Sequence, residues 1–161
     1  MIVVSNTSPI INLAAVDELA LLEKLYHRII IPHAVYHEIA VTGAGQPGSL
    51  EVQTYSWIES REVSNRALVT ALRTELDPGE SEAIALAIET KAEFLLIDER
   101  RGREVAARFG LKFIGLLGVL IEAKQKGYLE NVKPILSALE SKAGFRMSRE
   151  LKSRVLEAAG E

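Results

Sequence analysis

The chain has 161 residues, of which 19 are Lys or Arg and 22 are Asp or Glu, giving a net charge of −3 at neutral pH. Such an acidic chain is not a general binder of polyanions, so a nucleic-acid role requires a local basic patch. The absence of cysteine excludes disulfides, cysteine-ligated zinc and thiol catalysis. The length favours a single domain over residues 1–161.

The hydropathy of the chain predicts no segment that crosses a membrane. No signal peptide is apparent, and no apolar run approaches the roughly 20 residues that a membrane span needs. We therefore expect a soluble, cytoplasmic protein with no membrane partner.

Short apolar runs alternate with amphipathic stretches through the first two thirds of the chain. The apolar runs predict strands within residues 2–5, 28–32, 57–63, 94–98 and 112–115. Helical periodicity appears in residues 16–25, 32–41, 65–76, 79–90 and 101–110. This alternation predicts an α/β fold, with a central parallel sheet covered by helices on both faces.

The rest of the chain is only helical in pattern. From about residue 116 we expect a helical C-terminal extension of the same domain, with helices in residues 116–127, 130–142 and 148–160. The apolar residues of its second helix form one stripe, which packs either within the monomer or against a partner. Residues 42–49 are rich in glycine and are expected to form a mobile loop.

Polar residues gather where the predicted strands end, which is where open parallel sheets bind ligands. They are Asn6, Thr7, Ser8, His33, Glu38, Asp98 and Glu99, joined by Asp77, Glu80 and Glu82 at the start of a helix. Several acids are thus expected on one rim, where their repulsion is costly without a cation. Oxygen ligands without cysteine suit a hard ion such as Mg²⁺ or Mn²⁺.

Four motifs around these residues resemble a PIN domain: NTSPII, IP..V..EI, LDPGESEAIALA and LLIDER. The segments RRGREVAARFGLKFIGLLGVLIEAKQKG and GFRMS…L…AGE resemble the uncharacterised, VapC-like prokaryotic branch of that family. The resemblance implies a three-layer α/β/α fold and an Mg²⁺- or Mn²⁺-dependent ribonuclease, in which metal-activated water attacks RNA. Several relatives are toxins, so an antitoxin partner and a homodimer are also implied.

The resemblance also assigns the site. It implies that Asp98, Glu80, Glu38 and Asn6 bind metal and that Ser8 supports them through hydrogen bonds. Glu80 is preferred to Glu82 because its spacing from Asp98, 98 − 80 = 18 residues, fits the family interval better.

Asn6 departs from the family pattern, which usually has aspartate there. The amide removes one negative charge and weakens metal binding, leaving Asn6 as a weaker ligand or a residue that orients the water. The departure supports a second hypothesis, in which a catalytically weakened or inactive PIN-like module binds RNA or a protein partner.

Arg100, Arg101 and Arg103 form the best basic cluster near the predicted site. We expect them to bind substrate phosphates. Alternatively, one of them pairs with Asp98, or the cluster is a solvated helix face.

The rim residues also have purely structural explanations. Asn6 can cap the following helix, and Asp77 and Glu80 form a capping-box pattern around Pro78. Glu82 can be solvated or can support the ligands from behind. If every rim acid acts only in caps and ion pairs, the chain is a generic α/β protein.

Overall fold

The computed structural model describes residues Met1–Glu161 and is organised around five parallel strands. The strands are β1 (Val3–Ser5), β2 (Ile29–Pro32), β3 (Ile58–Arg61), β4 (Phe94–Leu96) and β5 (Phe113–Ile114). Their order in the sheet is β3-β2-β1-β4-β5, and every neighbouring pair is parallel. Each strand falls within a predicted apolar run, so the parallel sheet is confirmed.

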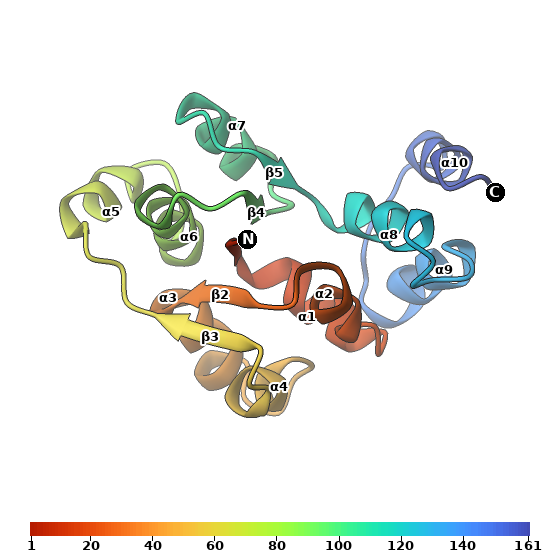
Figure 1. The fold of residues 1–161 in the computed structure, drawn as a ribbon, viewed down its shortest axis with the longest axis horizontal. Coiled ribbons are helices and arrows are strands. Elements are labelled where there is room, and N and C mark those ends of the chain that lie inside the picture. Colours follow the sequence, from red (N-terminus) through yellow and green to blue (C-terminus); the bar gives the residue numbers. More distant parts are fainter.

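Helices cover both faces of this sheet, which confirms the three-layer α/β/α architecture (Figure 1). One face carries α5 (Arg66–Leu72), α6 (Pro78–Thr90) and α7 (Arg100–Arg108). The other face carries α1 (Thr7–Ala15), α2 (Ala20–Tyr26), α8 (Leu116–Gln125), α9 (Lys133–Lys142) and α10 (Arg149–Ala158). Between β2 and β3 lie α3 (His33–Tyr36), the π-helix η1 (His37–Thr42) and α4 (Ser49–Thr54).

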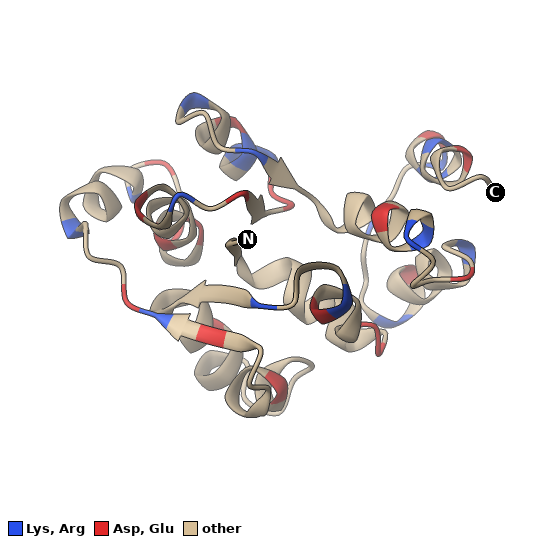
Figure 2. Cartoon of the chain, in the orientation of Figure 1, with Lys and Arg blue, Asp and Glu red and all other residues tan.

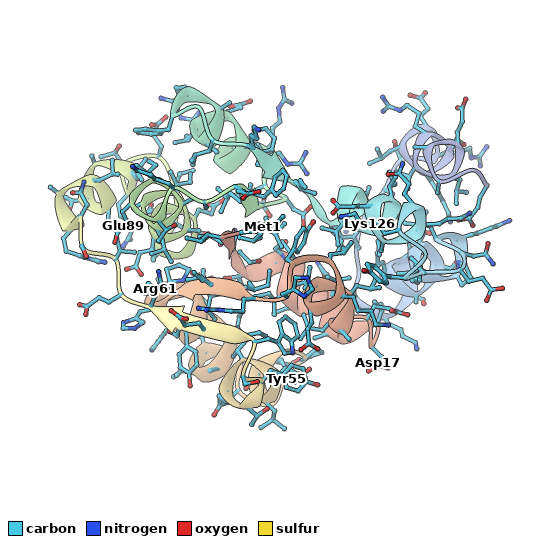
Figure 3. The ribbon with its side chains drawn as sticks, viewed as in Figure 1. Met1, Asp17, Tyr55, Arg61, Glu89 and Lys126 are labelled. Atoms are coloured by element: carbon cyan, nitrogen blue, oxygen red, sulfur yellow. The ribbon has the colours of Figure 1, made fainter.

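The two faces of the sheet bury two separate cores because side chains alternate along a strand. Val3 and Ile29 point into a cluster of 28 buried residues, whereas Val4 and Ile30 point into one of 15. Side chains fill the space between the sheet and the helices on both sides (Figure 3).

The C-terminal helices belong to the larger core. Val132, Ile135, Leu136 and Leu139 are all buried in it, so the apolar stripe packs within the monomer. The side chain of Glu161 accepts hydrogen bonds from the backbone N–H groups of Val132 (2.7 Å) and Lys133 (3.1 Å). These bonds hold the end of the chain against the first turn of α9.

Some local features differ from the sequence predictions. The patterns did not reveal α4 or the π-helical geometry of η1, and the irregular part of residues 42–49 is confined to residues 43–48. The helix expected from residue 16 begins at Ala20, because Asp17 adopts a left-handed backbone conformation with φ 58°. None of the helices has the length and apolar character needed to cross a bilayer.

The sheet has its topological switch point between β1 and β4. The chain moves from β1 outward through β2 to β3 and then returns to the opposite side of β1 with β4 and β5. The backbone N–H of Asn6 donates to the carbonyl of Leu96 (2.9 Å), which carries the pairing of β1 and β4 to the end of β1. Ligands bind at such a point beyond the carboxyl ends of the strands.

Candidate active site

Asp98 lies just after β4 and is held by contacts from three directions. Its Oδ1 accepts a hydrogen bond from the backbone N–H of Leu116 (2.8 Å) and lies 3.5 Å from Nη2 of Arg103. Its Oδ2 accepts a hydrogen bond from the hydroxyl of Ser8 (3.3 Å), which helps to orient the carboxylate. Burial raises the pKa of Asp98, while the Leu116 N–H and the charge of Arg103 lower it.

Asn6 lies at the end of β1 and is only 4% exposed. It occupies the N-cap position of α1, yet its side chain makes no capping hydrogen bond, so the capping alternative is not realised. Its Oδ1 is buried and has no hydrogen-bond partner. An unsatisfied buried group of this kind costs about 1–3 kcal/mol, a cost that a bound cation would offset.

Glu38 projects from η1 toward the starts of α1 and α6. Its Oε2 accepts a hydrogen bond from the hydroxyl of Thr7, and its Oε1 accepts from the backbone N–H of Gly79 (3.1 Å). Burial raises the pKa of Glu38, the Thr7 hydrogen bond lowers it, and the charge of Asp77 raises it. A Cβ atom at position 79 would lie 2.5 Å from Glu38 Oε1, so only glycine allows this approach.

Sequence reasoning missed both of these partners. Thr7 belonged to the polar cluster after β1 but had no assigned role, and Gly79 appeared only as part of a helix-start motif. No local pattern links either residue to Glu38, which lies 31 positions from Thr7.

Glu80 completes the predicted capping box at the start of α6. Its backbone N–H donates to Asp77 Oδ1 (2.8 Å), and its own Oε1 accepts from the Asp77 N–H (3.3 Å). Burial and the charge of Asp77 raise the pKa of Glu80 to about 7. Its Oε2 makes no hydrogen bond and faces Gly102, so Glu80 caps the helix and keeps one oxygen available.

Glu82 has both of its carboxylate oxygens occupied. Oε1 accepts from the backbone N–H of Ala34 (2.9 Å), and Oε2 forms an ion pair with Arg66 (2.9 Å). The residue is 8% exposed, so the expectation that it is solvated is wrong. Its contacts join α6 to α3 and α5, and they leave Glu80 as the acid of α6 with a free oxygen.

The three arginines at the start of α7 have different surroundings. Arg103 reaches Asp98, whereas Arg100 pairs with Glu104 (3.3 Å) and Arg101 with Glu75 (2.6 Å). The Arg100 side chain is 94% exposed. Figure 2 shows Lys and Arg distributed over many elements. Arg103 is therefore the member of this cluster that lies at the candidate site.

Glu38, Asp98 and Glu99 open onto two adjoining clefts beside α1, whereas Asn6 and Glu80 line neither cleft. The larger cleft, of about 600 Å³, is lined by Ser8, Asp98, Glu99 and Arg103, and the smaller, of about 370 Å³, by Thr7 and Glu38. Asn12 and Ala143 line both clefts. We call the two clefts together the rim groove.

The donor types at the rim suit a hard cation, but the acids do not form one cluster. No three His, Asp or Glu side chains come close enough to hold an ion together. The expected convergence of several acids is therefore incomplete, because hydrogen bonds hold Glu38, Glu80 and Asp98 to separate partners. Mg²⁺ commonly uses one or two carboxylates together with water and substrate phosphates. Asp98 and the unpartnered oxygen of Asn6 fit that more modest requirement.

The fold and the rim groove define a parallel α/β protein with a candidate ligand site at its switch point. A family model described as a PIN domain matches residues 2–161, and the chain belongs to the PIN domain family. This match confirms the resemblance to the PIN domain family, whereas the VapC-like branch stays a prediction. Membership indicates nuclease activity in general: PIN-domain nucleases act on RNA or DNA and generally depend on divalent metals. No curated protein matches the chain at a significant level.

Proposed function

We propose that the chain is an Mg²⁺- or Mn²⁺-dependent ribonuclease that hydrolyses RNA phosphodiesters. The observation that carries this proposal is the setting of Asp98. It is a largely buried acid at the switch point, oriented by Ser8 and Leu116 and opening onto a cleft of about 600 Å³. A buried acid in a family of metal-dependent nucleases is the natural centre of a metal site.

Asp98 and the amide oxygen of Asn6 would hold the metal in this proposal, and Glu80 and Glu38 would add negative charge from the same rim. When bound, such an ion supplies a nucleophilic water at neutral pH and neutralises charge on the attacking and leaving oxygens. Thr7 and Ser8 fix the orientation of Glu38 and Asp98 through their hydroxyl groups. Ligands positioned by hydrogen bonds in this way hold an ion more tightly than freely rotating side chains do.

Arg103 supplies positive charge next to Asp98. Its Nε donates to the carbonyl of Ile97 (3.1 Å), which fixes the guanidinium at the edge of the larger cleft. Guanidinium groups bind phosphate through several N–H donors. We therefore assign Arg103 to holding the phosphate beside Asp98, as the sequence predicted.

The first test compares RNA cleavage by the wild type and by Asp98→Asn. The amide oxygen of asparagine can still accept from the Leu116 N–H, so the fold should persist. We expect Mn²⁺-dependent cleavage of a mixed-sequence RNA by the wild type, and a loss on the order of 1,000-fold in the variant, because several kcal/mol of stabilisation disappear. Equal cleavage by both proteins, purified identically, would remove Asp98 from the mechanism.

Asn6 supports a second candidate function, a PIN-like module that binds RNA or a protein without cleaving. The amide lowers the negative charge available to a metal, and its oxygen remains unpartnered. RNA binding without cleavage, in Mn²⁺ and with several RNA sequences, would favour this candidate. Cleavage that depends on Asp98 would reject it.

We further propose that the protein is the toxin of a toxin–antitoxin pair and forms a homodimer. Val41, Leu50 and Tyr55 are 56%, 69% and 43% exposed and supply apolar surface near η1 and α4 for a second chain. Light scattering should give about twice the 17.7 kDa chain mass. Co-expression with the product of the neighbouring reading frame should suppress RNA cleavage; unchanged cleavage would argue against that antitoxin.

A further inference from the structure

The connection between α9 and α10 forms one wall of the rim groove. Gly144, Phe145 and Arg146 line the larger cleft together with Asp98. Lys142, at the end of α9, lines the smaller cleft together with Glu38. We call residues 142–146 the α9–α10 wall. Each half of the groove thus has an acid and, on the wall, a cation.

The wall is anchored to the body of the protein. Gly144 ends α9 with φ +67°, a conformation that favours glycine at the ends of helices. The backbone N–H of Phe145 then donates to the carbonyl of Leu139 (3.0 Å), and its ring packs against the larger core. The cations on either side of this anchor are therefore presented by an ordered segment.

Lys142 and Arg146 differ from the other cations near the site because they form no ion pair. Arg100 and Arg101 are paired with glutamates, and Arg103 is paired with Asp98. The α9–α10 wall therefore supplies the rim groove with two cations, Lys142 and Arg146, that no acid compensates. This is the kind of local basic feature that an acidic protein needs in order to bind a polyanion.

We propose that Lys142 and Arg146 bind the phosphates of a single-stranded RNA on the two sides of the bond to be cleaved. This inference rests on the proposed function for the identity of the substrate. Single strands are held by positively charged grooves that follow the backbone. The acids would then face the reacting phosphate, while the wall fixes the position of the strand along the groove.

The test compares two double variants with the same change in charge. Lys142→Ala/Arg146→Gln removes both wall cations, and Lys133→Ala/Arg154→Gln removes two unpaired cations of α9 and α10 that lie outside the rim groove. Both change the net charge from −3 to −3 − 2 = −5. Binding of a labelled single-stranded RNA is measured in EDTA at several salt concentrations, so that no cleavage occurs.

We expect the wall variant to bind roughly 20-fold more weakly at 0.1 M salt, with a log–log salt slope smaller by about 1.4, because each phosphate contact contributes about 0.7 to that slope. The control variant should change binding by less than about twofold. In Mn²⁺ the wall variant should raise KM and leave kcat nearly unchanged, since it loses substrate binding and no chemical group.

The outcomes separate this inference from the proposed ribonuclease activity. Equal weakening in both double variants, or an unchanged salt slope in the wall variant, would overturn the role of the wall even if the wild type cleaves RNA. If RNA binding is lost only in the wall variant and the wild type does not cleave RNA, the role of the wall in RNA binding is supported and the ribonuclease activity is rejected. A wild type that does not bind RNA would reject the inference.

Discussion

Two acids of α6, Glu80 and Glu82, are both under 10% exposed and lie two positions apart, yet their surroundings differ. Glu82 is compensated by Arg66 and by the N–H of Ala34, and it joins three helices. Glu80 has no cation, bonds only within its own capping box, and has a pKa raised to about 7. Burial alone therefore does not distinguish these two acids; the cation beside Glu82, which Glu80 lacks, does.

The same contrast separates two basic regions. The start of α7 has the highest density of arginine in the sequence, but Arg100 and Arg101 are held in ion pairs outside the rim groove. Lys142 and Arg146 are isolated in the sequence but free in the groove. In both comparisons the fold leaves one set of charges without a partner and compensates the other.

Among the variants that test these contrasts, the largest effect is expected from Asn6→Asp, which adds a negative charge at the end of β1. At short range the added Coulomb attraction should tighten Mn²⁺ binding on the order of 100-fold. Titration calorimetry measures the affinity. Asn65→Asp is the control, because Asn65 is an exposed cap of α5 and aspartate caps equally well. Unchanged affinity would remove Asn6 from the metal ligands.

Glu82→Ala tests whether the contacts of Glu82 with Ala34 and Arg66 stabilise the fold. It leaves the N–H of Ala34 and the guanidinium of Arg66 without their partner, so the free energy of unfolding should fall by about 2 kcal/mol. Glu82→Gln keeps an acceptor for Ala34 and should cost less than about 1 kcal/mol. Urea denaturation measures both. A loss of Mn²⁺ affinity in Glu82→Gln as large as that in Glu80→Gln would erase the distinction between the two acids.

Glu80→Gln tests whether Glu80 lacks a compensating cation, and the readout is the pH dependence of the free energy of unfolding. Without metal, the native state holds a proton on Glu80 up to about pH 7, whereas the unfolded state releases it near 4.5. The native state thus binds more protons in this window, and stability falls as pH rises through it. At pH 8 in EDTA, removing the charge should therefore raise the free energy of unfolding by about 1–2 kcal/mol, with little change at pH 4.5.

Urea denaturation at both pH values measures the effect. A change in stability at pH 8 alone reports the charge of Glu80, since glutamine keeps the acceptor for the Asp77 N–H at both pH values. Mn²⁺ should stabilise the variant less than the wild type. Destabilisation at pH 8 would mean that the Glu80 carboxylate is already compensated, as that of Glu82 is.

The smallest effect is expected from Arg100→Gln/Arg101→Gln. Both side chains are more than half exposed, and exposed ion pairs contribute little, so stability should change by less than about 0.5 kcal/mol. RNA binding in EDTA should weaken by less than about twofold if these residues lie outside the path of the strand. Weakening beyond that of Lys142→Ala/Arg146→Gln would place the strand on α7.

Local sequence patterns are enough to predict the layered fold and the edge of the sheet that carries the candidate site. Short apolar runs that alternate with helical patterns are typical of strands in a parallel sheet, and the polar residues after them then lie at one edge of that sheet. The Asp77–Glu80 capping box was also predictable, because it depends on residues three positions apart. The PIN family motifs could also be recognised in the sequence, because each consists of residues close together along the chain.

The tertiary structure alone decided which charges are compensated. Arg66 and Glu82 are 16 positions apart, and Ser8 and Asp98 are 90 apart. Periodicity reports only which face of an element is buried, whereas such contacts depend on how whole helices pack on the sheet. Packing of α9 and α10 on the larger core brings Lys142 and Arg146 to the rim groove. The sequence thus supplied the charged groups, and long-range packing decided which of them remain free to bind a ligand.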